Sequence, residues 1–153
     1  MHHLLIIAHT PSENLIKLRN ALQEGVSRAG VSDVALTVEA PLQSDAKDAL
    51  NADAIIILTP ENLGYMAGAT KDWFDRIYYP TLELKQGMPL VTIIRAGHDG
   101  TGTERALKTI TTGLRWRWVQ DALILKGDYQ AAWEDDLKDL GEAIATALSE
   151  GII

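Results

Sequence analysis

The sequence contains no cysteine, which excludes disulfide bonds, thiolate catalysis and cysteine-ligated metals. It also lacks a long hydrophobic run: the longest apolar stretches, residues 4–8 and 54–58, are far shorter than a membrane-spanning helix. No segment combines a basic start, an apolar run and a small-residue cleavage site. The expectation is therefore a cytoplasmic protein with no membrane partner.

Runs of lysine or arginine are absent as well, and the net charge is −7. Proteins that bind nucleic acid are more often basic, so a nucleic-acid partner is not expected. Hydrophobic residues make up 46% of the chain and charged residues 23%, as in ordinary globular proteins. Because the chain has 153 residues and no internal repeat, we predict a single domain over residues 1–153.

Apolar runs alternate with segments of helical periodicity along the whole chain. Strands are predicted at residues 4–8, 34–39, 54–58, 89–95 and 119–125. Helices are predicted from residue 15 to the stop at Gly30, from a cap at Ser44 to about residue 52, over 66–79 with Pro80 at the end, over 103–115, and from Trp133 to Leu148.

This alternation predicts an α/β fold with five parallel strands and helices on both faces of the sheet. Right-handed crossovers leave few topologies, and 2-1-3-4-5 is the common strand order for five strands. Ligands of such sheets bind beyond the carboxyl ends of the strands, beside strands 1 and 3. Three loops reach that edge, residues 9–15, 59–66 and 95–102.

The first loop leads straight from strand 1 into a helix. A helix N-terminus offers unpaired N–H groups and partial positive charge, which suits a phosphate, and the hydroxyls of Thr10 and Ser12 and the amide of Asn14 add donors. The alternative is simple helix capping by Ser12, with Glu13 favourable in the first turn. His9 is interpreted as a strand-end histidine.

The second and third loops are rich in glycine. Gly64 and Gly68 allow the backbone to approach a flat ligand, and Tyr65 is the only aromatic residue in either loop. The third loop contains Gly97, Gly100 and Gly102, but its spacing and its place after strand 4 differ from the dinucleotide-binding fingerprint. Ordinary strand-to-helix connections remain the alternative for both loops.

Residues 59–76 read TPENLGYMAGATKDWFDR. This segment resembles the P-E-Y-N-x-x-x-x-G-x-L-K-x-x-x-D segment of flavodoxin-like NAD(P)H-dependent FMN reductases and tryptophan-repressor-binding-protein-type flavoproteins. Pro60, Glu61, Gly68, Lys71 and Asp75 match in register, whereas Asn62, Leu63 and Thr70 differ. The first loop resembles the phosphate loop of that family in part, with Glu13 and Leu15 in place of glycine and threonine. The likeness extends strand by strand over almost the whole chain.

The resemblance implies a flavodoxin-like three-layer sandwich that binds FMN and takes hydride from NADH or NADPH. It implies transfer through the flavin to a quinone or similar small-molecule acceptor, with no catalytic side chain and no metal. A flavodoxin-type electron carrier and a flavin-free domain of the same fold are the alternatives. The implied cofactor-binding residues are His9, Thr10, Ser12, Glu13, Asn14 and Leu15 for the phosphate, and Pro60, Glu61, Asn62, Leu63, Gly64, Tyr65, Ala96, Gly97, His98, Gly100 and Gly102 for the ring.

Residues 115–118 alternate two arginines with two tryptophans, Trp116 and Trp118. One interpretation is an interface of a homodimer or homotetramer, or a lid over the cofactor of a neighbouring subunit, and the resemblance favours an oligomer. The other is that one tryptophan packs in the core and the arginines are exposed.

Overall fold

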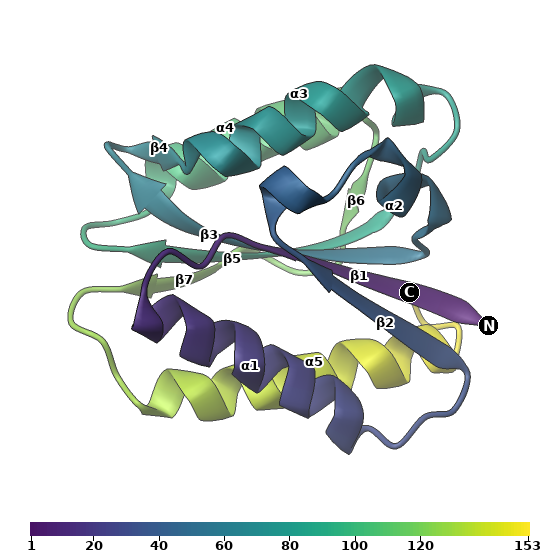
Figure 1. Cartoon of the computed structure of the whole chain (residues 1–153), viewed down its shortest axis with the longest axis horizontal. Helices are drawn as coiled ribbons and strands as arrows, with labels where there is room; N and C mark the ends of the chain where they lie inside the picture. Colours follow the sequence, from purple (N-terminus) through teal and green to yellow (C-terminus); the bar gives the residue numbers. More distant parts are fainter.

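The computed structural model describes residues 1–153 as a sheet between two layers of helices (Figure 1). The sheet order is β2-β1-β3-β5, and two short strands then pair with β5 one after the other along its length. All these pairings are parallel, and β1 lies inside the sheet between β2 and β3, so the predicted order 2-1-3-4-5 is confirmed. The strands are β1 (His2–Ala8), β2 (Val34–Glu39), β3 (Ala54–Asn62), β5 (Pro89–Ala96), β6 (Arg117–Trp118) and β7 (Leu123–Lys126), with β4 (Tyr65–Met66) pairing only with β3.

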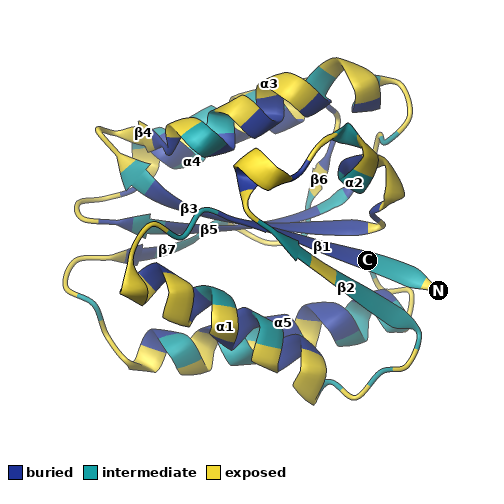
Figure 2. Cartoon of the chain, in the orientation of Figure 1, coloured by how far each residue is buried: buried dark blue, intermediate teal, exposed yellow.

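Helices cover both faces of the sheet. One layer contains α1 (Glu13–Arg28) and α5 (Ala132–Ser149), and the other contains the 3-10 turn η1 (Pro41–Gln43), α2 (Ala46–Asn51), α3 (Gly68–Leu82) and α4 (Thr101–Gly113). Because both faces are covered, β1 and β3 are apolar along most of their length (Figure 2). Leu4 and Ile6 pack towards α1 and α5, whereas Leu5 and Ile7 pack towards α3 and α4. No helix is both long and apolar enough to cross a membrane.

The largest difference from the sequence prediction lies after residue 58. The strand predicted to end at Leu58 continues to Asn62 and turns back antiparallel into β4, so Met66 is in a strand and α3 begins at Gly68. Pro60 is tolerated because the Leu58 carbonyl accepts from the His9 N–H on the β1 side, so the missing N–H of Pro60 faces the side where β1 has ended.

The other helices and strands begin and end within about one helical turn of their predicted boundaries. Pro80 lies inside α3, which continues to Leu82 while the Thr81 hydroxyl donates to the Ile77 carbonyl at 2.8 Å. The predicted fifth strand is two short strands, 117–118 and 123–126, and α4 spans 101–113.

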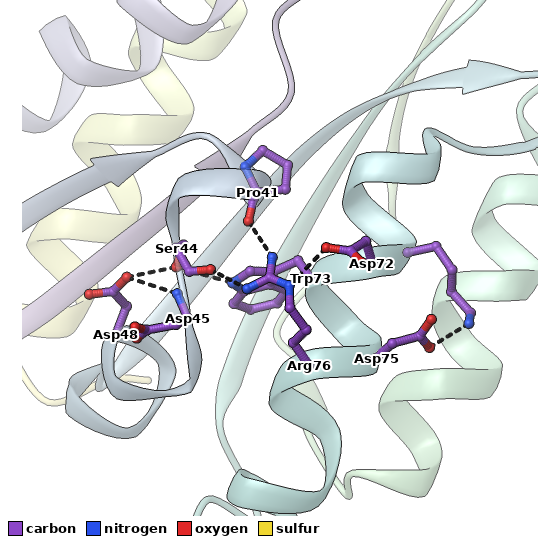
Figure 3. Close-up of polar contacts among 9 residues, drawn as sticks. Pro41, Ser44, Asp45, Asp48, Asp72, Trp73, Asp75 and Arg76 are labelled. Carbon is purple, nitrogen blue, oxygen red and sulfur yellow. Dashed lines mark hydrogen bonds and ion pairs between the residues drawn. The ribbon is translucent and has the colours of Figure 1, made fainter.

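Ser44 does not cap α2 as predicted. Asp45 is the N-cap, and its side chain accepts from the Lys47 N–H at 2.9 Å. Ser44 instead joins the η1–α2 connection to α3, because its hydroxyl accepts from the Trp73 indole N–H at 3.1 Å (Figure 3). Arg76 of α3 reinforces this junction by donating to the carbonyls of Ser44 at 2.6 Å and Pro41 at 2.7 Å.

Trp116 packs inside the chain. Its ring centroid is 6.4 Å from that of Trp73 and 6.1 Å from that of Phe74, and it is only 6% exposed. Trp118 is half-buried and donates to the Thr111 hydroxyl at 2.8 Å, while the arginines at 115 and 117 are exposed. The core-packing interpretation therefore holds for Trp116, and a homodimer or homotetramer stays a prediction for light scattering.

Candidate functional site

Parallel strands bring the three predicted loops to one edge of the sheet, at the left of Figure 1. The register pairs Ala8 with Leu58 and Pro60 with Arg95, so the chain leaves β1, β3 and β5 at neighbouring points. A helix start, a hairpin and a glycine-rich loop meet there. A broad hollow elsewhere, along α4, is lined by residues of that single helix and is not enclosed. No cluster of side chains suited to holding a metal ion is present.

The start of α1 combines a cap with free donors. Ser12 is the N-cap: its hydroxyl accepts from the Leu15 N–H at 3.3 Å, and its carbonyl accepts from the Ile16 N–H at 3.0 Å. The N–H groups of Glu13 and Asn14 have no acceptor within the chain. The capping interpretation of Ser12 is therefore confirmed, and two N–H groups at the positive end of the helix remain open to an anion.

Glu13 and Leu15, the two residues that differ from the phosphate loop of the resembled family, lie in different environments. The side chain of Glu13 is exposed and pairs with no cation, so its charge stands beside the free N–H groups. The side chain of Leu15 is 5% exposed and packs into the core beneath α1. Leu15 thus supports the helix, and its N–H is already taken by Ser12.

Arg19 is a residue of this region that the sequence did not single out. It lies in the second turn of α1 and reaches back, so that its Nη1 donates to the Thr10 hydroxyl at 3.3 Å. The sequence indicates Arg19 only weakly, as a basic residue about one turn into the helix that follows strand 1. Arg19 places a positive charge at the same loop as Glu13.

His9 follows β1 directly and lies half-buried at the same edge. Its N–H donates to the Leu58 carbonyl at 3.0 Å, which fixes the start of the loop to β3. Burial lowers the pKa of the His9 imidazole below its usual value, because desolvation disfavours the charged form of the ring.

The second predicted loop is a hairpin whose tip is exposed. Leu63 and Gly64 form the turn with φ of 53° and 77°, the pattern of a two-residue type I′ connection. Leu63 is fully exposed, and Asn62, Gly64 and Tyr65 are exposed beside it. Four of the six predicted ring residues of this segment are thus presented to solvent at the edge of the sheet.

The base of the hairpin is tightly braced. The buried Thr59 hydroxyl donates to the Pro60 carbonyl at 2.9 Å and accepts from the Ala67 N–H and the Thr70 hydroxyl, both at 3.2 Å. Thr59 was not among the predicted site residues, although it stands at the end of the apolar run. Its bonds hold the hairpin base against the start of α3.

The hairpin also contacts the start of α4. The Glu61 carboxylate accepts from the Thr103 hydroxyl at 3.1 Å, and a Cβ on Gly102 would lie 2.1 Å from the Gly64 carbonyl oxygen. Glycine at 102 therefore permits the close approach of the two predicted ring-binding segments. Thr103 is a second residue that the sequence did not indicate.

The third loop offers a further set of backbone donors. Ala96 is buried, and its carbonyl accepts from the Gly127 N–H at 3.0 Å and from Arg95 at 2.7 Å. Gly97 and His98 are exposed, Gly100 is buried with φ of 72°, and no N–H of residues 97–100 donates within the chain. Two hydrogen bonds from Thr101 lower the pKa of the Asp99 carboxyl.

Comparison with known proteins identifies the fold. No family model matches the chain, and no curated protein matches its sequence. An archaeal flavodoxin structure is similar, with a TM-score of 0.78 and 15% identity, covering 97% of this chain and 99% of that one. A flavodoxin, WrbA-like protein from Agrobacterium tumefaciens gives 0.72 and 14%, covering 97% and 98%. NADH:FMN oxidoreductase in its apo form gives 0.72 and 15%, covering 97% and 90%. The chain therefore has a flavodoxin-like fold.

Proposed function

We propose that this chain binds FMN at the carboxyl edge of its sheet and acts as an NAD(P)H-dependent oxidoreductase with a quinone or similar small acceptor. The observation that carries the proposal is the start of α1, where the N–H groups of Glu13 and Asn14 lie free beside the hydroxyls of Ser12 and Thr10. A phosphate dianion is the type of group that such donors bind. The flavodoxin-like fold places this helix start beside the ends of β1 and β3.

The residues present fit the phosphate end of FMN, and the neighbouring segments are suited to its ring. When bound, FMN supplies the hydride and electron transfer chemistry of its isoalloxazine ring. The chain would hold the phosphate at the start of α1 and border the ring with the hairpin around Leu63 and Tyr65. The unpaired N–H groups of residues 97–100 would stabilise negative charge on the reduced ring.

Access for a hydride donor distinguishes a reductase from an electron carrier. Tyr65 is the only aromatic side chain in the two ring segments, so a second aromatic is missing that would cover the other ring face. An open face favours direct reaction with NADH or NADPH. One of the similar structures is named as an NADH:FMN oxidoreductase, which supports this assignment, whereas others are flavodoxins and support the carrier as the second candidate.

The test starts with an FMN titration of the purified protein, followed by flavin fluorescence and visible absorption. We expect saturable binding with one FMN per chain, and then FMN-dependent oxidation of NADH or NADPH that a quinone sustains. Tight FMN binding without NAD(P)H oxidation would assign the chain to the electron carriers. Absence of FMN binding would refute the proposal and favour a flavin-free domain of this fold.

A further inference from the structure

Arg19 has a charge that no carboxylate of the chain neutralises. The chain has 21 acidic and 14 basic residues, and Arg28 and Arg76 are both paired with aspartate or glutamate. Arg19 is half-buried, and none of the ion pairs in the structure includes it. A partly desolvated guanidinium without a counter-ion in an acidic protein is available to an external anion.

The position of Arg19 directs that charge to the loop before α1. Nη1 donates to the Thr10 hydroxyl at 3.3 Å, and Nη2 donates to the Asn20 side chain at 3.2 Å. A guanidinium has five N–H groups, so the other three remain free. The bond to Thr10 holds the side chain back along the first turn of α1, towards the loop that contains Ser12 and Glu13.

Glu13 supplies the opposing charge at the same loop. Its exposed carboxylate would repel a phosphate dianion bound at the free N–H groups, and it has no cation partner of its own. Arg19 is the basic side chain bonded to this loop, and its charge offsets that repulsion. Riboflavin has the ring of FMN but no phosphate. The charges of Glu13 and Arg19 should therefore affect the binding of FMN and not that of riboflavin.

We infer that Arg19 is a phosphate-binding residue that makes this site prefer FMN to riboflavin. The inference rests on the proposed function, since it concerns the same site. Thr10 holds the guanidinium in place, and the guanidinium then pairs with the phosphate as a charged hydrogen-bond donor.

The experiment measures dissociation constants for FMN and riboflavin by flavin fluorescence in the native protein and three variants. Arg19→Gln removes the charge, and Arg19→Lys keeps it. The matched control is Arg117→Gln. Arg117 is likewise in no ion pair, but its side chain is exposed, and its backbone pairs with Pro89 at the opposite end of β5 from the site. All variants are checked for native unfolding behaviour.

We expect Arg19→Gln to weaken FMN binding about tenfold and to change riboflavin binding less than about twofold. Arg19→Lys should retain most of the preference, and Arg117→Gln should leave it unchanged. The preference should shrink as salt is added.

Three results would overturn the inference while leaving flavin binding in the native protein intact. The first is a loss of FMN affinity in Arg19→Gln that Arg117→Gln matches. The second is a parallel loss of riboflavin and FMN affinity in Arg19→Gln, and the third is no loss of affinity for either flavin. A native protein that binds neither flavin would refute the proposed function and the role of Arg19 together.

Discussion

Replacement of Gly102 by alanine tests whether the hairpin and α4 depend on close contact. In the native structure the added Cβ would lie 2.1 Å from the Gly64 carbonyl oxygen. Ordinary contact requires about 3.5 Å, so the two segments must separate by more than about 1 Å. The helix is anchored by Thr103 and Leu107, which are fully buried, so the exposed turn at Leu63 and Gly64 must move.

The magnitude follows from three contributions. Forced overpacking costs about 1–3 kcal/mol, and the displaced turn loses the hydrogen bond from Thr103 to Glu61. Alanine in a helix recovers about 0.5–1 kcal/mol relative to glycine, since the unfolded chain is less flexible. We therefore expect a net loss of about 1–2 kcal/mol, which lowers the melting temperature by about 2–8 °C in a chain of this size.

Gly68→Ala is the matched control. Gly68 is also a helical glycine, at the start of α3, but nothing lies within 4 Å of its added Cβ. It should leave stability unchanged or raise it by up to about 1 kcal/mol. Thermal and urea unfolding of both variants measure the difference. Gly102→Ala as stable as Gly68→Ala would show that the hairpin and α4 do not need this contact.

Three further predictions concern other parts of the molecule. Glu13→Gly should tighten FMN binding about tenfold, or about 1.4 kcal/mol, and Glu13→Gln should show how much of that gain is charge alone; equal affinity in fluorescence titrations of all three proteins would contradict it. Arg76→Ala should lower the free energy of unfolding by about 1–2 kcal/mol, because the carbonyls of Ser44 and Pro41 lose a charged donor; urea unfolding measures this, and an unchanged midpoint would contradict it. Burial and Glu134 raise the pKa of Tyr129 to about 12, so its stabilising contribution is present below pH 10, the ordinary value, and is lost as pH rises towards 12; ultraviolet titration should show one late tyrosine that is missing in Tyr129→Phe.

Much of the fold follows from local pattern. The apolar runs at 4–8 and 54–58 and the helical periods between them are enough to predict a parallel sheet covered on both faces, because only strands buried on both sides are apolar at every position. The cap at Ser12 also follows from the sequence, because a serine just before a segment of helical periodicity has a partner close by, the Leu15 N–H.

Tertiary contacts decided the parts where local pattern was ambiguous. Thr59-Pro60 resembled the end of a strand, yet pairing with β5 and the bonds of the buried Thr59 hydroxyl carry the strand into a hairpin. Ser44 resembled a cap until the indole of Trp73, 29 residues away, occupied its hydroxyl. Arg19 resembled any solvated helix residue, and only the formation of α1, along which the side chain reaches back to Thr10, brings its charge to the loop. A local pattern determines where the chain extends, coils or turns, but long-range partners determine which polar group a side chain meets, and these partners exist only in the folded chain.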